Sequence, residues 1–523
     1  MSRSRRLLCL PLALLLALAM AVPVTAAGDP DRRTLQRYAV DTWRSFVALV
    51  DPGTALPADN IRGSLRGSTR SGYTSPTNIG MYFWATLAAR DLGLISGEEA
   101  VSRIDATLTT VEGLERHEPS GQFWNWYSPQ TGEKLTVWPE PPHDRVVFPF
   151  ASSVDNGWLA SGLIMVANAV PELQDRAWEL ATSMNFGCYY DPNAKGPDAG
   201  AGLIRGGFWV KGEEPPGSGG FPRDFYCDES GTDVVYTGHH YGAFNTEPRI
   251  ASYIGIALNQ IPEEHYFGGW RTFPDTCDWS WPETKPIGVW REYLGVDVFE
   301  GAYPYDDQLI VPTWGGSMFE ALMVPLVVPE EEWGPDSWAV THPLYVESQI
   351  EYGLDEAEYG YWGFSPSSNP AGGYREYGVD VLGMDTVGYT SDVERLTSIE
   401  SGWDDPACFR AAQTIDDYGQ GVVTPHAAFL ALDFAPGATL ENLRNLADDF
   451  DGLYGHGGFK DAVNVATGQV ANRYLALDQG MVMAAIANEL TGDQLQDYLA
   501  VTLQPSLKPL MAIEEFGAGR IAP

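Results

Sequence analysis

Apolar residues recur at helical spacing along most of the chain, and stretches rich in glycine and proline separate these segments. Segment 97–115 places its apolar positions on one stripe of a helix. Segments 250–258 and 480–490 are apolar on almost every side, so as helices they must be buried between other elements. The pattern predicts twelve helices, near 34–50, 77–93, 97–115, 154–169, 171–186, 246–259, 315–325, 339–354, 423–433, 439–450, 476–491 and 494–503. Thr77 is a candidate cap for the second of them.

Twelve helices with an inner, buried set predict an all-α fold, a closed double ring known as an (α/α)6 toroid. An irregular helical solenoid is the alternative, but no repeat of 20–50 residues is visible to support it. Because no linker or low-complexity tract interrupts the chain, we expect residues 28–523 to form a single domain. A few short strands are expected around 204–210 or 461–475. Long loops, which in compact domains are usually functional, are expected at 116–152, 187–245, 260–314 and 355–422.

The first 27 residues have the pattern of a signal peptide. Three arginines precede an apolar run over 7–22, and small residues follow at 25–27. No later stretch of 18 apolar residues exists, so the mature chain is expected to be soluble and exported, either extracellular or periplasmic. Four cysteines remain after the signal and predict up to two disulfides, with buried free thiols as the alternative: Cys188, Cys227, Cys277 and Cys408.

Charge narrows the range of partners. The chain carries 70 acidic and 32 basic side chains, a formal net charge of -38. This balance excludes a nucleic-acid partner, because binding a phosphate backbone requires a cationic surface. No phosphate-binding loop, zinc-protease motif or dinucleotide fingerprint is present, so no cofactor or metal is expected. We also expect a monomer with no membrane contact after signal removal.

Three carboxylates stand where a long loop enters an apolar helix: Asp155, Glu247 and Asp478. Hydrolysis of a glycosidic bond requires two carboxyl groups, one kept protonated and one ionised. Glu247 is the candidate general acid and Asp478 the candidate base, with Asp155 in a supporting role. In the alternative interpretation Glu247 pairs with Arg249, and the two aspartates only cap helices. If inner helix ends meet at one face of a ring, the three acids converge.

Further residues are candidates for substrate binding because aromatic rings stack on sugar faces and polar groups bond to hydroxyls. For each of them a purely structural role is the alternative. They are Trp124, Trp126, Trp314, Glu320, Tyr374, Arg375, Glu376, Tyr377 and His426.

An ordered set of segments resembles the bacterial glucoamylase-like family. The matching segments are 77–80, 88–94, 123–127, 153–157, 362–365, 373–374, 423–428, 458–461 and 477–486. This family includes the endo-β-1,2-glucanases of glycoside hydrolase family 144 and a domain of cyclic β-1,2-glucan synthases. The resemblance implies an (α/α)6 toroid and an anomer-inverting hydrolase, with a water activated through a substrate hydroxyl.

By motif position, the resemblance implies that Glu247 is the general acid, Asp478 the acidic residue implicated as base, and Asp155 another acid of the cleft. The sequence departs from the family where Pro248 follows Glu247, since relatives usually carry Ala or Met there. Loops 187–245 and 260–314 are also longer than in relatives.

We therefore expect a secreted, endo-acting, inverting glycoside hydrolase whose partner is a polysaccharide or oligosaccharide, with a β-1,2-glucan as the expected substrate. The same fold acting on an arabinan or a heteropolysaccharide is the first alternative. A polysaccharide lyase and a non-catalytic glycan-binding surface protein are the others.

Overall fold

The computed structural model describes residues 30–143, 145–218, 234–276, 284–384, 402–404 and 421–521. The predicted signal peptide and three of the four mature cysteines lie outside these residues, so the predicted export and disulfides are not tested. The described part contains thirteen α-helices: α1 (Pro30–Leu49), α2 (Pro76–Asp91), α3 (Gly97–Glu112), α4 (Ser153–Ala169), α5 (Gln174–Ser183), α6 (Arg249–Ala257), α7 (Met318–Leu322), α8 (Glu330–Trp333), α9 (Trp338–Glu351), α10 (Pro425–Leu430), α11 (Pro436–Asp449), α12 (Ala476–Thr491) and α13 (Gln494–Met511).

Each of the twelve predicted helices corresponds to an observed one, and α8 is an addition. The largest difference is at α13, which runs past Pro505 and Pro509 although proline removes a backbone hydrogen bond. Leu503, Leu507 and Leu510 of this helix are buried, and their packing outweighs the lost bonds. The predicted cap Thr77 is also wrong, because the hydroxyl of Ser75 accepts the N–H of Asn78 and caps α2.

The short strands form eight small sheets in the described residues. The larger ones are β10 (Ile287–Tyr293), β11 (Val296–Tyr305), β12 (Gln308–Ile310) and β21 (Gly519–Arg520); β4 (Ala151–Ser152), β7 (Gly207–Val210) and β8 (Val234–Tyr236); β5 (Tyr190–Asp191), β6 (Leu203–Arg205) and β9 (His240–Tyr241); and β15 (Val422–Val423), β18 (Val463–Asn464) and β19 (Gln469–Val470). The two-stranded ones pair β1 (Asn60–Arg62) with β20 (Arg473–Leu475), β2 (Arg116–His117) with β3 (Gln122–Phe123), β13 (Ser367–Ser368) with β14 (Tyr374–Arg375), and β16 (Tyr454–Gly455) with β17 (Gly458–Phe459).

The predicted helical class is confirmed, but strands are more numerous than the few expected. Those predicted around 204–210 and 461–475 are present as β6, β7 and β18–β20. The β10–β11 hairpin was expected to be loop, and its ten-residue strand β11 is almost wholly buried. Among the described residues, none of the helices has the length and apolar character that crossing a bilayer requires.

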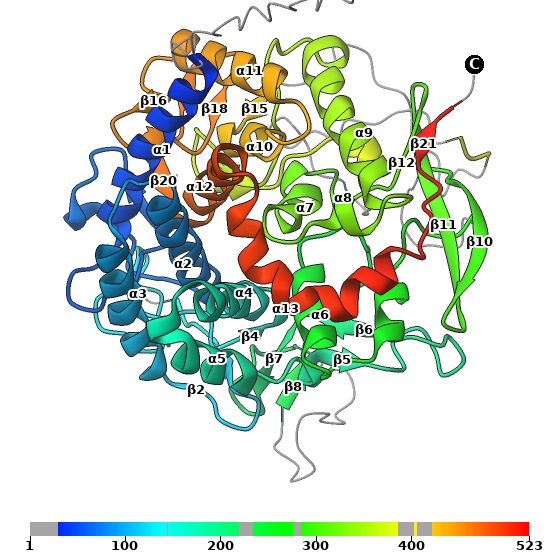
Figure 1. Cartoon of the computed structure of the whole chain (residues 1–523), viewed down its shortest axis with the longest axis horizontal. Helices are drawn as coiled ribbons and strands as arrows, with labels where there is room; N and C mark the ends of the chain where they lie inside the picture. The colour runs from blue at the N-terminus through cyan, green and yellow to red at the C-terminus, as the bar shows by residue number, and fades with distance from the viewer. Residues whose placement is uncertain are drawn as a thin grey trace, which may run out of the picture.

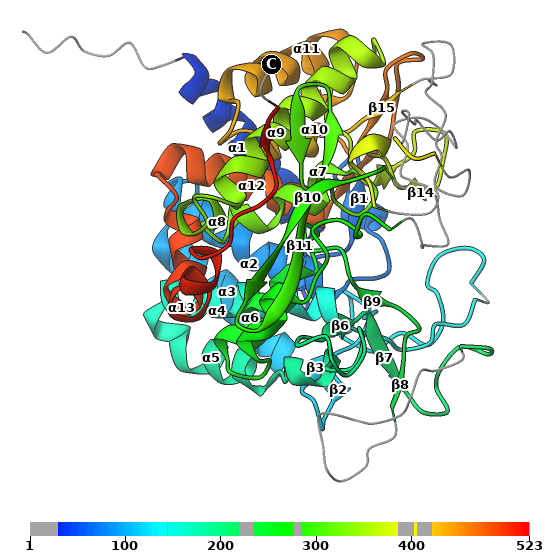
Figure 2. The same cartoon turned by 90° about the vertical axis from the view of Figure 1, so that its right-hand side faces the viewer.

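The most buried helices lie next to one another. Helix α2 packs on both α4 and α12, α4 packs on α6, and α10 packs on α12 and α7. Helices α1, α3 and α5 lie outside them, and α13 crosses α4, α6 and α12 at one end (Figure 1). Strands β4, β9, β15 and β20 come shortly before α4, α6, α10 and α12. In Figure 2 the strands β6, β7, β9, β14 and β15 lie on the side opposite α13, which is therefore the side of these helix N-termini.

Candidate active site

Three acidic residues occupy the same position in three inner helices. Asp155, Glu320 and Asp478 are each the third residue of their helix, in α4, α7 and α12. Ser152 and Ser317 cap α4 and α7, and their hydroxyls accept the N–H of Asp155 and of Glu320, each at 3.2 Å. In a capping box the third-residue carboxylate would bond back to the cap residue. Here the carboxylates bond to neighbouring segments instead.

Glu247 meets two of these helices just before α6 begins. Its carboxylate accepts a hydrogen bond from the indole N–H of Trp158 in α4. Its backbone N–H donates to Glu320 Oε2 at 2.9 Å. The hydroxyl of Thr77, in the first turn of α2, donates to Asp155 Oδ1 at 2.7 Å. The N-terminal ends of α2, α4, α6 and α7 therefore form one acidic group, in which Asp155 and Glu320 both act electrostatically on Glu247.

Burial and like charge set the titration of this group. Removal from bulk water raises the pKa of Glu247 well above its ordinary value, and the negative charge of Glu320 raises it further. Burial also raises the pKa of Glu320, to about 7, although the Glu247 N–H and the charge of Arg249 oppose the rise. Glu320 therefore ionises first, and the negative charge that it then carries favours the protonated form of Glu247.

Arg249 does not pair with Glu247, so that alternative is wrong. Its guanidinium forms a buried bidentate pair with Glu330 of α8, with both N–O distances 2.8 Å. It also donates to the carbonyl oxygens of Thr246, Glu320 and Ala321 at 2.7–3.0 Å. Arg249 thus binds the start of α6 to α7 and α8, and it fixes the position of the Glu247 segment relative to Glu320.

A second group of acids surrounds the start of α12. Side-chain atoms of Asp478, Asp461 and His426 all lie within 4.8 Å of one another, and all three residues are buried. Asp461 is hydrogen-bonded to Asp478. Burial followed by the charge of Asp478 raises the pKa of Asp461 well above its ordinary value, whereas the pKa of Asp478 is raised to about 7. Asp461 is therefore the protonated partner, and Asp478 accepts its hydrogen bond.

His426 supports this acid pair and is not a ligand-stacking ring. The Thr424 hydroxyl donates to the backbone carbonyl of Asp461, so it accepts from His426 Nδ1 at 2.8 Å. The Ser365 hydroxyl is then the donor to Nε2 at 3.0 Å. Burial lowers the pKa of His426 to about 4, so the ring is neutral with its proton on Nδ1. With Nδ1 engaged as a donor toward Thr424, the cluster does not fit a metal ion.

Helix α2 joins the two acidic groups. Next to Thr77, which binds Asp155, Asn78 donates to Asp59 Oδ1 at 3.1 Å. Asp59 acts electrostatically on Asp478 and raises its pKa. Two consecutive residues in the first turn of α2 therefore contact Asp155 of the first group and Asp59, which acts on the second group.

The predicted binding residues have different outcomes. Trp314 lines a cavity of about 270 Å³ together with Glu320, Tyr241 and His239. Tyr374 is 54% exposed, and Asp478, Asp461 and Asp59 all act electrostatically on its hydroxyl.

Beside Tyr374, Arg375 is half-buried in β14 and Glu376 is exposed. Trp126 is half-buried, and its ring contacts Tyr73 edge-on at 5.4 Å between centroids.

Two of the predicted aromatic residues cannot present a ring to a ligand in this structure. Trp124 is only 3% exposed and packs against His117 and Phe208. Tyr377 is fully buried and its hydroxyl accepts a hydrogen bond from Asn369 at 2.7 Å. Both expectations are corrected to structural roles, because their faces are covered by protein.

Sequence reasoning did not assign roles to Asp461, Trp158 and Asp59. Asp461 ends the quoted segment 458–461, and Trp158 directly follows segment 153–157, so those segments held the available signal. Asp59 lies in a loop before β1 and had no signal in the sequence.

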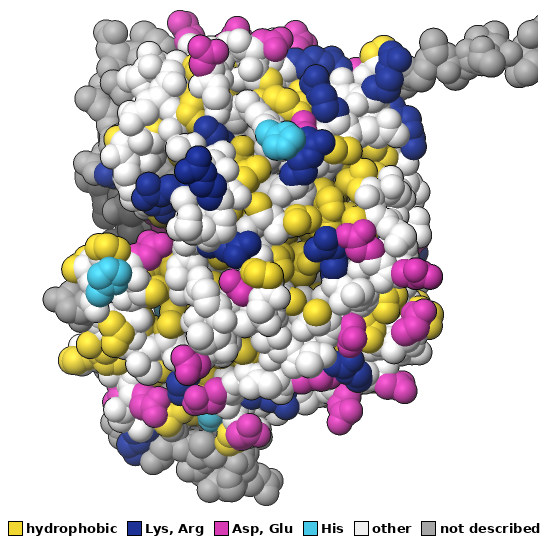
Figure 3. Space-filling model, turned by 90° about the vertical axis from the view of Figure 1, so that its left-hand side faces the viewer, with side chains coloured by type: hydrophobic (Ala, Val, Ile, Leu, Met, Phe, Trp, Pro, Cys, Tyr) yellow, Lys and Arg dark blue, Asp and Glu magenta, His cyan; other side chains and the backbone are white. Residues whose placement is uncertain are grey.

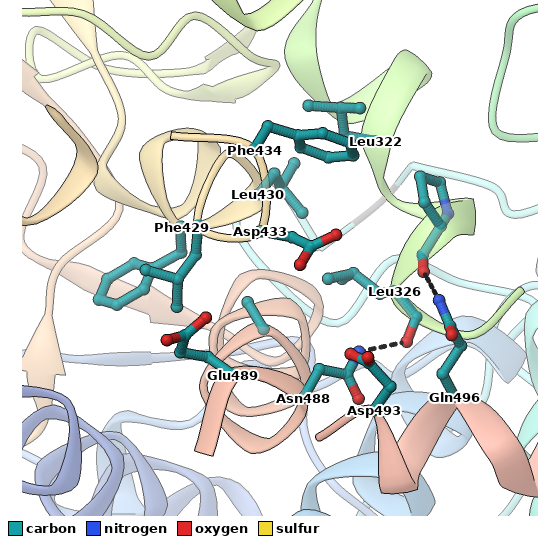
Figure 4. Close-up of a pocket in the computed structure, with 13 residues that line it drawn as sticks. Leu322, Leu326, Phe429, Leu430, Asp433, Phe434, Asn488, Glu489, Asp493 and Gln496 are labelled. Atoms are coloured by element: carbon teal, nitrogen blue, oxygen red, sulfur yellow. Dashed lines mark hydrogen bonds between the residues drawn. The ribbon is translucent and has the colours of Figure 1, made fainter. Parts of the chain in front are cut away.

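A further cavity lies away from these acids. It measures about 30 Å³ and lies between α7, α10, α12 and α13 (Figure 4). Asp433, Glu489 and Asp493 line it with mainly apolar neighbours. None of the residues predicted from the sequence lines it.

Comparisons with known proteins match both halves of the chain. The family model "Putative glucoamylase" matches residues 284–499, and a "Protein of unknown function (DUF3131)" model matches residues 37–187. The chain is 24% identical over 584 aligned residues to the cyclic β-(1,2)-glucan synthase NdvB of Rhizobium meliloti. The alignment covers 89% of this chain and 18% of the synthase. The chain spans less than a fifth of the length of the curated relatives it matches.

Solved structures share the fold. A "putative glucoamylase" from Bacteroides uniformis superposes with a TM-score of 0.61 at 17% identity, covering 92% of this chain and 98% of that one. An endo-β-1,2-glucanase from Chitinophaga pinensis, solved with sophorotriose and glucose, gives 0.60 at 16% identity with the same coverages. The family resemblance predicted from the sequence is confirmed, and the neighbours include glycoside hydrolases.

Proposed function

We propose that the chain is an endo-acting, anomer-inverting glycoside hydrolase and that its substrate is a β-1,2-linked glucan. The observation that carries this proposal is the pair of acidic groups at the helix N-termini. One contains Glu247, whose pKa is raised well above its ordinary value by burial and by the charge of Glu320, and the other contains Asp478, a buried carboxyl whose pKa is raised to about 7. Hydrolysis by inversion needs one carboxyl in each state.

Glu247 is the general acid. Its raised pKa favours the protonated form, which can donate to the leaving glycosidic oxygen. The Trp158 indole holds the carboxyl in place, and Glu320 binds the adjacent backbone N–H. Asp155 adds negative charge that favours the positive charge that develops on the sugar ring in the transition state.

Asp478 is the base, and Asp461 is its positioning residue. The proton on Asp461 is hydrogen-bonded to Asp478, which holds that carboxylate in one orientation. A carboxylate with a pKa of about 7 is a stronger base than an ordinary one and can take a proton from water, directly or through a substrate hydroxyl.

The relatives support a β-1,2-glucan as substrate. The synthase that aligns over most of this chain is named for a β-1,2-glucan, and a structural neighbour is named as an endo-β-1,2-glucanase. We further propose that α2, α4, α6, α7, α10 and α12 form the inner ring of an (α/α)6 toroid. The successive contacts among these helices support it, together with the Arg249 contacts that join α6 to α7.

Export is a separate proposal, supported by the sequence of the first 27 residues alone. Mass spectrometry of the protein recovered outside the cytoplasm tests it. A mature chain that begins near residue 28 is expected, and an intact N-terminus contradicts it.

Product analysis tests the proposed activity. The protein is incubated with linear and cyclic β-1,2-glucan, with other glucans, with arabinan and with a heteropolysaccharide, and products are separated by chromatography. We expect a ladder of short oligosaccharides from β-1,2-glucan. Glu247→Gln is expected to lose more than about a hundredfold in rate, since general acid catalysis contributes that much. Glu172→Gln, at an exposed acid just after the C-terminal end of α4, is the matched control for loss of one carboxyl.

Preferential cleavage of another glycan contradicts the substrate assignment. Products that absorb near 235 nm indicate a lyase. Near-normal activity of Glu247→Gln contradicts the assignment of the acid.

A further inference from the structure

A second cavity beside the β10–β11 hairpin combines aromatic rings with charged side chains. It measures about 190 Å³, and we call it the hairpin cavity; its lining includes Lys195, Asp198, Trp270, Trp290 and Phe299. The hairpin runs along the outside of the molecule, at the right of Figure 1 and toward the viewer in Figure 2. Aromatic walls with a few polar groups are typical of sites for small ligands.

Trp290 presents its ring to water from a fixed position. It is 62% exposed, more than any other tryptophan in the described part of the chain. It lies directly opposite Phe299 in the antiparallel pair of β10 and β11, and the two ring centroids are 5.4 Å apart. Such a cross-strand contact restricts the orientation of both rings. An oriented and exposed indole can stack on the apolar face of a sugar ring.

Lys195 supplies a charged hydrogen-bond donor to the same cavity. Its ammonium lies over the ring of Trp270, 5.0 Å from the centroid, and donates to the Gly268 carbonyl at 2.8 Å. An ammonium can donate three hydrogen bonds, so the contact with Gly268 leaves two for hydroxyl groups of a ligand. Asp198 adds a hydrogen-bond acceptor to the lining. Stacking rings together with donors and acceptors suit a neutral sugar.

The hairpin cavity adjoins the cavity beside Glu320. Gly242 and Ala243 line the cavity at Glu320, whereas Gly269 and Trp270 line the hairpin cavity. The Trp270 N–H donates to the Gly242 carbonyl at 2.7 Å, and a Cβ on Gly242 would lie 2.5 Å from the Trp270 ring. The Trp270 indole therefore lies against backbone that lines the cavity at Glu320, so one glycan chain can reach both cavities.

We propose that the hairpin cavity binds one sugar residue of the same glycan chain that is cleaved at the acids, and that it is a distal subsite of the active site. The net charge of -38 favours a neutral sugar over an anionic chain as its occupant. This inference rests on the proposed function, because it extends the binding region for the same substrate.

The test measures kcat/KM on linear β-1,2-gluco-oligosaccharides of increasing length. In the wild type kcat/KM should rise with length until one chain spans both cavities, because the distal contact adds binding energy. Trp290→Ala should lower kcat/KM for the long chains about fivefold, the factor that one lost aromatic contact is worth, and should leave the shortest cleaved chain unaffected. Unchanged cleavage of the shortest chain also shows that this variant is folded.

Two controls separate the stacking ring from the loss of any exposed tryptophan. Trp290→Tyr keeps a ring and should retain most of the length dependence. Trp178→Ala removes a tryptophan of α5 that is 39% exposed, and its length dependence should match that of the wild type. Helix α5 lies on the other side of the molecule from the hairpin (Figure 1), and on that side acidic, basic and apolar side chains are interspersed (Figure 3).

An unchanged length dependence in Trp290→Ala, or an equal loss on chains of every length, overturns the proposal. So does a wild type that is dimeric while Trp290→Ala is monomeric, because the ring then packs against a second copy of the chain. If the wild type cleaves none of the oligosaccharides, the proposed function fails by itself. Calorimetry with the same series then decides the hairpin cavity: an affinity for the long chains that Trp290→Ala does not lower overturns it.

Discussion

At the scale of single residues, neighbouring hydrogen-bond donors and charges determine which of the buried carboxyl groups is protonated and which is ionised. Glu247 receives the Trp158 indole, while Glu320 receives a backbone N–H and lies near the Arg249 cation. The backbone N–H and the Arg249 charge stabilise the ionised form of Glu320, so the proton is on Glu247. Asp461 and Asp478 also differ in protonation, because one proton, held by Asp461 and donated to Asp478, forms the hydrogen bond between the two carboxyl groups.

The Trp158 hydrogen bond lowers the pKa of Glu247, so its loss should move the pH profile. In Trp158→Phe the acid should hold its proton to a higher pH, because the ionised form loses a donor. We expect the basic limb of the kcat/KM profile to shift upward while the acidic limb, which reports Asp478 near pH 7, stays in place. Trp178→Phe, at an exposed tryptophan, is the control. A basic limb that moves downward or not at all contradicts the role of Trp158.

Asp478 also makes a prediction for stability. Its pKa is raised in the folded state, so its contribution is fully present below the unfolded pKa near 4 and is lost as the pH rises through about 7. Asp478→Asn stays neutral and should be more stable than the wild type at pH 8, by roughly 1–3 kcal/mol, with little difference at pH 4. Denaturant unfolding at both pH values measures this. Asp297→Asn, at an exposed position, should leave the free energy of unfolding unchanged at both pH values. An Asp478→Asn variant that is less stable than the wild type at pH 8 contradicts the assigned cost of burying the carboxylate.

The sequence identified acids by their place before an apolar helix, which is why Glu247, Asp155 and Asp478 were predicted. Asp461 was missed because it precedes the short strand β18 and no helix pattern marks it. A backbone hydrogen bond from its N–H to the carbonyl of Arg473 in β20 holds it close to the start of α12. Trp124 was overestimated, because a tryptophan in a loop can equally well be core, and only tertiary packing decides.

At the scale of elements, the Arg249–Glu330 pair and the other hydrogen bonds of Arg249 connect α6, α7 and α8 next to the acids. The pair is buried and bidentate, and Tyr253 also donates to Glu330 at 2.7 Å. Glu330→Ala leaves the Arg249 charge buried and unpaired, which should cost about 3–5 kcal/mol in unfolding free energy. The matched control is Glu347→Ala, which breaks the exposed pair with Arg520 and should cost less than about 1 kcal/mol. Equal losses of unfolding free energy in the two variants contradict the proposed role of the Arg249–Glu330 pair.

Helix positions were predictable from apolar spacing, but helix ends were less so. Thr77 was taken for a cap because it begins the apolar segment, whereas Ser75 has that role and leaves the Thr77 hydroxyl for Asp155. The continuation of α13 past two prolines depends on partners far away in sequence. The β10–β11 hairpin was not predicted because its exposed strand β10 carries Val289 and Trp290 on the surface, without a clear alternation.

At the scale of the whole molecule, the site is assembled from helices α2, α4, α6, α7, α10 and α12, which together span residues 76–491. The sequence predicted that inner helix ends would meet at one face. It did not predict the residues that connect the two acidic groups. Contacts such as that of Asn78 with Asp59 join segments that lie close together only because α2 packs between α4 and α12.

The account as a whole depends on Glu247 and Asp478 acting on opposite sides of one glycosidic bond. Proton NMR of the first products formed from linear β-1,2-glucan tests this most directly. We predict that the new reducing ends appear first as the α-anomer, because inversion converts the β-linkage, and that Glu247→Gln forms almost no product. First products in the β-anomeric form, or equal product formation by Glu247→Gln, would contradict the account.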